Sequence, residues 1–166
     1  MKKIIKDYLM GMIVGFNSSK YWRLRSKVVD KDNKYPKIIL YYYLFIIKRI
    51  ESKNNSSLGT NIGIGAKFED TPVLPHHLNG IVISPYAKFG KNVTIFQQVT
   101  VGERMGKAPQ FGDNVYIGAG AKIIGDIKIG NNVRIGANAV VIRNVPDNAD
   151  AVGVPAEIKM HEKTGK

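Results

Sequence analysis

The sequence of 166 residues contains no cysteine. This absence excludes a disulfide framework, a thiolate nucleophile and a cysteine-based metal site, and it fits a reducing compartment. Long apolar runs are also missing: the most apolar stretch, residues 38–47, is about half the roughly 20 residues that a membrane-spanning helix needs. The start does not read as a signal peptide, because Lys6 and Asp7 interrupt its apolar run. We therefore expect a cytoplasmic protein that does not cross a membrane.

Acidic residues are scarce, with 13 Asp and Glu against 25 Lys and Arg, which gives a formal net charge of +12. The imbalance is concentrated in residues 1–57, which hold 13 of the basic residues and 4 of the acidic ones. Such a segment suggests an anionic partner, whether a membrane surface, nucleic acid or a phosphorylated substrate. It can equally be a solvated surface without a partner. No helix-turn-helix or zinc pattern accompanies it, so nucleic acid is not expected.

From residue 83 onward a large apolar residue recurs at every sixth position, with one slip. The set is Ile83, Phe89, Ile95, Val101, Phe111, Ile117, Ile123, Ile129, Ile135 and Val141. A helix buries positions spaced by 3.6 and an ordinary strand buries every second one, so neither explains a period of six. The period predicts a mainly β protein, a hexapeptide-repeat β-helix in which each unit is one short strand and a turn. Asn92, Asn114, Asn131 and Asn132 are available for positive φ at its corners.

Two gaps in the repeat are longer than the period allows: fifteen positions instead of twelve before Ile83, and ten instead of six before Phe111. The extra residues must bulge out of the column, and loops on a rigid scaffold are where binding and catalytic groups tend to lie. The first bulge contains residues 75–80 and the second contains residues 103–109.

These patterns divide the chain into three parts: a basic helical segment, residues 1–57, the β-helix, residues 58–158, and a polar tail, residues 159–166. At three hexapeptides per turn the β-helix has about five turns. The tail has no repeat and is expected to be loose.

The basic segment is expected to form helices. Residues 4–15 suit a short apolar helix, and a charged segment follows at residues 20–27. Pro36 suits the first turn of a further helix that ends near Lys53, because proline lacks the N–H that is unpaired there anyway. This last helix is apolar almost all round, so something must cover it: the open first coil of the β-helix, a neighbouring subunit, or lipid headgroups at the membrane surface.

Two of the three histidines, His76 and His77, are adjacent in the first bulge. Imidazole titrates near neutral pH and is the usual general base for a hydroxyl nucleophile. A histidine pair on a loop is by itself more often a surface feature. Neighbouring histidines rarely converge on one ion and no cysteine supports them, so no metal is expected. His161 lies in the tail and is interpreted as incidental.

Four stretches together resemble a known family: residues 77–83, 92–102, 117–123 and 151–156. They resemble the serine acetyltransferase branch of the hexapeptide-repeat acyltransferases, and the resemblance covers residues 58–158. It implies a left-handed parallel β-helix and a homotrimer. It also implies active sites between neighbouring subunits, where the co-substrate acetyl-CoA lies along the coils without a metal.

The resemblance also implies roles for individual residues. The catalytic histidine of the family maps onto His77, which would be the general base on the acceptor hydroxyl. The coenzyme-binding coils of the family map onto Gly102, Ala119 and Ala137. Lys107 in the second bulge is our hypothesis for a phosphate contact, because it is a cation beside a glycine.

The chain departs from the branch where an amino acid would be held. His76 and Asn61 stand where the branch has aspartates, and Ala108 stands where it has a second histidine. With Asn79, which lies in the turn behind the general base, His76 and Asn61 are the candidate residues for binding the acceptor.

These departures favour a hydroxyl of a sugar or surface-glycan intermediate over L-serine as the acceptor. The predicted function is therefore an acetyl-CoA-dependent O-acetyltransferase of polysaccharide biosynthesis. It would act in the cytoplasm, and the basic segment would allow peripheral contact with the inner face of the membrane. A serine O-acetyltransferase and a non-catalytic β-helix binding scaffold remain as alternatives, because fold alone does not fix function.

Overall fold

The computed structural model describes residues 16–161. The helix expected over residues 4–15 therefore lies outside the described residues, as does most of the polar tail. Within the described range, no helix is both long enough and apolar enough to cross a membrane.

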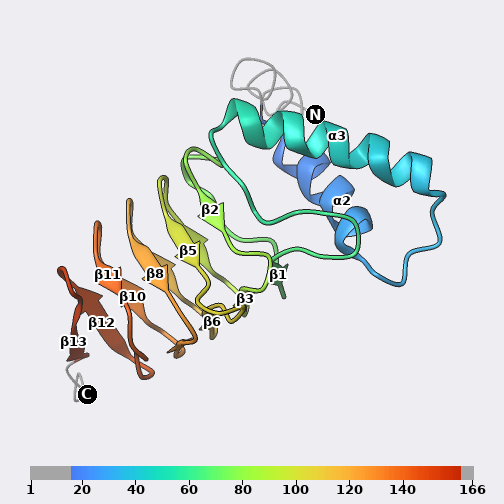
Figure 1. Ribbon diagram of the computed structural model, residues 1–166. Coiled ribbons are helices and arrows are strands. Elements are labelled where there is room, and N and C mark those ends of the chain that lie inside the picture. The colour runs from blue at the N-terminus through green and yellow to red at the C-terminus, as the bar shows by residue number, and fades with distance from the viewer. Residues whose placement is uncertain (1–15, 162–166) are drawn as a thin grey trace.

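Short parallel strands stack into three sheets that form the sides of a column (Figure 1). Sheet I contains β1 (Lys67–Phe68), β3 (Lys88–Phe89), β6 (Gln110–Phe111) and β9 (Lys128–Ile129). Sheet II contains β4 (Thr94–Ile95), β7 (Tyr116–Ile117), β10 (Arg134–Ile135), β12 (Ala149–Val152) and β13 (Glu157–Met160). Sheet III contains β2 (Val82–Ile83), β5 (Thr100–Gly102), β8 (Lys122–Ile124) and β11 (Val140–Val141). The chain passes from sheet I to II to III in every turn, which confirms the predicted β-helix, and its hexapeptide repeat fits the left-handed form.

The interior of the column is filled by the residues of the six-residue register. All ten apolar residues of the repeat are at most 6% exposed. In sheet I the rings of Phe68, Phe89 and Phe111 stack nearly parallel, with centroids 4.6 and 4.5 Å apart. Each buried side chain of this size contributes about 1.5–3 kcal/mol relative to an exposed one. The repeat therefore stabilises the column through its interior.

The corner between sheets I and II is built by asparagines. Asn92, Asn114 and Asn132 all adopt positive φ, and so does Asn148 in the last coil. Their side-chain amides form a ladder, with each Nδ2 donating to the Oδ1 of the next asparagine at 2.9–3.1 Å. Asn131 is a correction to the sequence-based expectation: it is absent from the positive-φ residues, and its Oδ1 instead accepts from the backbone N–H of Asp113.

The C-terminal end of the column extends past the boundary expected after residue 158. Strand β13 pairs antiparallel with β12, and the ring of His161 lies 2.7 Å from a carboxylate oxygen of Asp150. The first residues of the tail are therefore part of sheet II.

Two helices lie at the N-terminal end of the column (Figure 1). Helix α2 (Ser18–Val29) begins after Asn17, whose side chain accepts from the backbone N–H of Lys20 at 2.9 Å. Helix α3 (Lys37–Lys53) ends at Lys53 as predicted, but Pro36 is its N-cap residue and does not belong to the first turn. The helices pack against each other, and their buried side chains are continuous with the core of the first coils.

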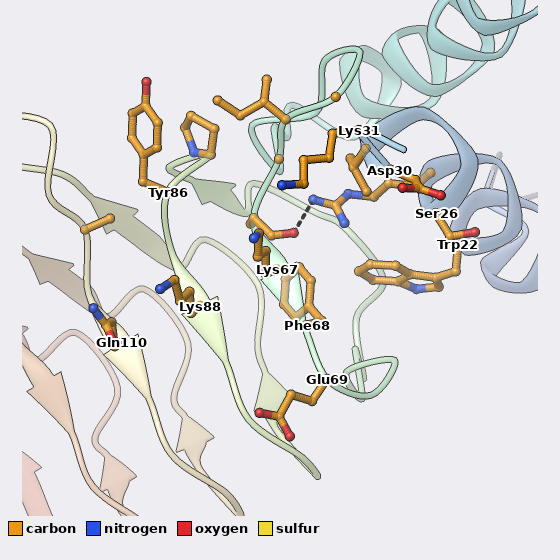
Figure 2. A pocket seen from close by; sticks show the side chains of 18 of the residues that line it. Trp22, Ser26, Asp30, Lys31, Lys67, Phe68, Glu69, Tyr86, Lys88 and Gln110 are labelled. Carbon is orange, nitrogen blue, oxygen red and sulfur yellow. Dashed lines mark hydrogen bonds between the residues drawn. The ribbon is translucent and has the colours of Figure 1, made fainter. Parts of the chain in front are cut away.

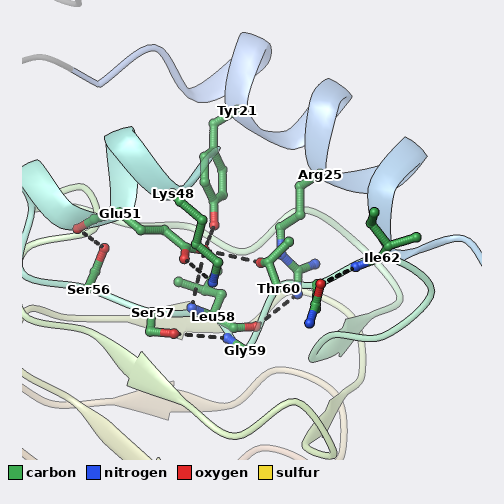
Figure 3. A network of polar contacts seen from close by, with 11 residues as sticks. Tyr21, Arg25, Lys48, Glu51, Ser56, Ser57, Leu58, Gly59, Thr60 and Ile62 are labelled. Carbon is green, nitrogen blue, oxygen red and sulfur yellow. Dashed lines mark hydrogen bonds and ion pairs between the residues drawn. The ribbon is translucent and has the colours of Figure 1, made fainter. Parts of the chain in front are cut away.

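A buried polar network joins both helices to the first coil (Figure 3). The Glu51 carboxylate accepts from the hydroxyls of Tyr21, at 2.8 Å, and Thr60, at 3.1 Å. The Arg25 guanidinium donates to Thr60 and to two carbonyl oxygens of the coil. Burial, reinforced by the Glu51 charge, raises the pKa of Tyr21 well above its usual value, and burial lowers the pKa of Arg25. Both charges are almost fully buried, so each depends on the other groups of the network.

We expect Glu51→Ala to destabilise the protein by about 3–5 kcal/mol, because it leaves Arg25 buried without a compensating charge. The free energy of unfolding from denaturant titration measures this. Glu157→Ala, which removes an exposed carboxylate from β13, is the matched control and should change the free energy by less than about 0.5 kcal/mol. Equal effects of the two substitutions would contradict a structural role for the network.

Candidate active site

The two bulges leave the column at different corners. The first bulge connects Val73, which pairs with sheet II, to β2 of sheet III, so it lies at the II–III corner. The second connects β5 of sheet III to β6 of sheet I and lies at the III–I corner. Within one chain, the candidate residues of the two bulges are therefore not brought together.

His77 has a constrained position in the first bulge. Its backbone has φ +56°, an uncommon value for a residue other than glycine, and its N–H donates to the carbonyl of Leu74. Its ring is partly buried, with the Phe16 ring 5.3 Å away between centroids. The next residue, Leu78, is completely buried, and Gly80 N–H donates to the carbonyl of Asn54 at the end of α3. The bulge is thus held in place by contacts of the residues that precede and follow His77 in the chain.

Below this bulge, one residue from each coil forms a column along the II–III corner, which we call the corner column. It consists of Asn79, Gln97, Ala119 and Ala137. Backbone hydrogen bonds of 2.8–2.9 Å hold it: the carbonyls of Asn79, Gln97 and Ala119 each accept from an N–H of the next coil. Three predicted site residues, Asn79, Ala119 and Ala137, therefore share one corner with His77.

Gln97 is a member of the corner column that the sequence analysis missed. Its Oε1 atom is buried and has no hydrogen-bond partner among the described residues. A buried acceptor without a partner costs about 1–3 kcal/mol and calls for an explanation. The signal was present, because Gln97 occupies the same repeat position as Ala119 and Ala137.

His76 points to a different neighbour from His77. It is exposed, and its ring centroid lies 5.8 Å from that of Phe96 in the next coil. The two imidazoles contact different rings. Residues 16–161 contain no cluster of three or more potential metal ligands.

Two acidic residues, Glu69 and Asp70, precede the first bulge, and a nearby carboxylate could orient the His77 ring. Both are exposed and line a cavity on the outside of sheet I. No hydrogen bond from either to the imidazole is present in the described part of the chain.

Asn61 lies at the III–I corner and not beside the His77 of the same chain. It forms a tight turn with Ile64, in which each backbone N–H donates to the other's carbonyl, and its Oδ1 accepts from the N–H of Ile62. The turn contacts the end of α2 through Gly63 N–H and Val28 O, at 2.8 Å.

The second bulge holds Lys107 at the same III–I corner. Its ammonium forms an ion pair with Asp126 at 2.8 Å, and this contact raises the pKa of Lys107. Met105, at the tip, is 95% exposed. Gly102 ends β5 just before the bulge, where an added Cβ would contact the Ile124 side chain at 3.5 Å. The second bulge therefore carries an exposed lysine that is paired with Asp126. In the sequence, this lysine lies shortly after the small residue Gly102.

A cavity of about 1030 Å³ opens between α2, the outer face of sheet I and the second bulge (Figure 2). Lysines of sheet I, the ring of Trp22 and the residues Lys107 and Ala108 line it. The indole Nε1 of Trp22 is buried without a partner among the described residues. His77 is not among the lining residues, so this cavity and the corner column are separate features of one chain.

Comparison with known proteins agrees with this geometry. Residues 108–143 match the family model described as bacterial transferase hexapeptide (six repeats). The matched residues lie within the β-helix, from the end of the second bulge to just past β11. Over 104 residues it is 46% identical to a serine acetyltransferase of Staphylococcus aureus strain Mu50, a match that covers 60% of this chain and 48% of the relative.

Solved structures of serine acetyltransferases are also similar to this chain. One in complex with cysteine superposes with a TM-score of 0.71 at 29% identity and covers 92% of this chain and 57% of that one. One in complex with CoA gives a TM-score of 0.67 at 29% identity and covers 88% and 57%. The chain spans about half the length of the curated relatives it matches. The resemblance found in the sequence is thus confirmed at the level of the serine acetyltransferases, whereas these matches give no support to the narrower surface-polysaccharide assignment.

We expect Gln97→Met to leave the midpoint of thermal unfolding unchanged or higher without ligand, because the substitution conserves volume and removes an acceptor that has no partner among residues 16–161. Acetyl-CoA, the co-substrate that the resemblance implies, should stabilise the variant less than the wild type, because the variant lacks the Oε1 atom. Differential scanning fluorimetry measures both, with Gln110→Met, an exposed glutamine of sheet I, as the control. A lower midpoint without ligand would show that Oε1 has an internal partner.

Proposed function

We propose that this protein transfers an acetyl group from acetyl-CoA to the hydroxyl of a small acceptor. The proposal rests mainly on one observation: His77 is held in a constrained backbone conformation at the head of the corner column. The similarity to serine acetyltransferases, one of them solved with CoA, supports it.

The proposed acetyl transfer needs one general base from the chain. The neutral His77 imidazole takes the proton of the acceptor hydroxyl while the oxygen attacks the thioester carbonyl. The tetrahedral intermediate then collapses, the carbon–sulfur bond breaks, and the imidazolium returns its proton to the departing thiolate. The products are the O-acetyl ester and free CoA, and His77 is regenerated.

The corner column would hold the coenzyme. Ala119 and Ala137 have side chains too short to cover the backbone, so the pantetheine arm can lie against the coils. Asn79 and Gln97 offer amide groups between these alanines and His77. In this proposal they contact the polar atoms nearest to the reacting centre.

The placement of the remaining candidates supports a site shared between subunits. Lys107 and Asn61 lie at the III–I corner, whereas His77 lies at the II–III corner. In a homotrimer with cyclic symmetry, the III–I corner of one protomer can face the II–III corner of the next. Lys107 would then approach the coenzyme phosphates of the neighbouring protomer, and Asn61 would approach its acceptor.

The names of the relatives favour L-serine as the acceptor, and we take it as the first candidate. A sugar hydroxyl is the second candidate because of two side chains. Ala108 is buried and offers no polar group where the serine acetyltransferase branch has a histidine, and His76 offers no carboxylate where that branch has an aspartate. A site of this composition has fewer groups to bind the charges of an amino acid.

We expect His77→Asn to lower the rate of CoA release about 10²–10⁴-fold, because the general base is lost. The measurement is thiol release from acetyl-CoA in the presence of acceptor. His161→Asn, which alters the histidine paired with Asp150 in sheet II, is the control and should retain the wild-type rate. Wild-type turnover by His77→Asn would remove the proposed base.

The acceptor is decided by the same assay with a panel of serine, simple sugars and nucleotide sugars. We expect L-serine to accelerate thiol release above the rate with acetyl-CoA alone. Acceleration by a sugar and not by serine would favour the second candidate. No acceleration by any acceptor, with acetyl-CoA still bound in calorimetry, would favour the non-catalytic scaffold.

A further inference from the structure

Helix α3 exposes a continuous aromatic and aliphatic stripe. Ile38, Tyr41, Tyr42 and Phe45 are 78%, 61%, 62% and 62% exposed. Their spacing of three and four residues places them on one face of the helix. We call this set the α3 stripe. Isolated exposed apolar residues are normal on a protein surface, but four that share one helix face indicate an interaction surface.

The α3 stripe is not needed for the packing of the helix. The core side of α3 is formed by other residues: Leu40 and Ile47 are buried, and Glu51 belongs to the polar network with α2 and the first coil. The helix is therefore anchored on one side and presents a second apolar side away from its anchor.

The charges around the stripe have one sign. Every exposed charged side chain of α3 is basic: Lys37, Lys48, Arg49 and Lys53. The only acidic residue of the helix, Glu51, is 2% exposed and paired. Lys37 stands just before the stripe, and Lys48 and Arg49 follow its last residue, so cations flank it at both ends.

We propose that the α3 stripe lies in the headgroup region of an anionic membrane. A helix with apolar and aromatic residues on one face and flanking cations binds at this depth, where tyrosine has both an apolar ring and a hydroxyl that stays hydrated. The stripe runs along one side of α3, a helix of 17 residues and about 25 Å, so the helix would lie parallel to the membrane surface. The inference concerns where the protein acts and does not depend on the proposed reaction.

Charge complementarity decides between a lipid surface and a second copy of the chain. A second α3 stripe would bring its own flanking lysines and arginine against those of the first, and like charges in contact are unfavourable. An anionic lipid surface instead attracts each of them, at about fivefold in affinity per basic residue near the surface. The acidic residues nearest in sequence, Asp30 and Asp32, belong to the lining of the cavity beside sheet I and not to the stripe.

Vesicle co-sedimentation of the full chain tests the proposal. We expect binding to phosphatidylcholine vesicles that contain phosphatidylglycerol, weaker binding to phosphatidylcholine alone, and a decrease with salt. The double variant Tyr41→Ser, Phe45→Ser should lose most of the binding. Tyr116→Ser, which removes a 43% exposed tyrosine from sheet II, should retain it.

The electrostatic contribution to vesicle binding is tested with two triple variants that remove the same number of charges from different places. Lys37→Gln, Arg49→Gln and Lys53→Gln together should weaken binding to the anionic vesicles about fivefold per charge removed. Lys91→Gln, Lys128→Gln and Lys159→Gln together lower the net charge equally, but on the β-helix, and should have a smaller effect. Circular dichroism verifies that every variant is folded.

Three results would overturn the proposal. The first is no sedimentation of the wild type with anionic vesicles. The second is equal loss of binding in the two charge variants, which would indicate a general effect of net charge. The third is a particle size in light scattering that falls in the Tyr41→Ser, Phe45→Ser variant while lipid binding persists, which would assign the stripe to contact between copies of the chain.

Discussion

The structure depends on one constraint: interior side chains must stack in register from coil to coil. The phenylalanine rings of sheet I, only 4.6 and 4.5 Å apart, show how little freedom this leaves. Parallel strands pair residue with residue, so an inserted residue cannot be absorbed inside the column. It must leave at a corner. The same rule that fixes the core therefore fixes where chemically active groups can lie, and the bulge with His77 is one result.

The sequence predicted the column well because a six-residue apolar period is explained by a β-helix and not by a helix or an ordinary strand. Ten apolar residues at six-residue spacing identify the interior, and each one is buried. Two details could not be read in this way. Asn131 and Asn132 are adjacent and chemically equal, and only the fit to the next coil decides which takes positive φ. Strand β13 has no six-residue period, because it runs antiparallel and three of its four residues are exposed.

The candidate site was predictable in part. Counting insertions located the bulge that holds His77, and the repeat position placed Ala119 and Ala137 along the same corner. Gln97 occupies the equivalent position, but its long polar side chain does not resemble the small side chains of Ala119 and Ala137. The corner of Asn61 and the cavity beside Trp22 could not be predicted, since both depend on how α2 packs against the first coil.

The two ends of the column contain elements that are absent from its middle. Helices α2 and α3 occupy one end, and at the other the antiparallel β13 takes the free edge of sheet II. A stack of parallel strands would otherwise be a template on which another molecule could continue the same pairing. In sheet II the reversed strand β13 interrupts the parallel stacking at the C-terminal edge. That edge therefore does not present the parallel register of the coils to a further molecule.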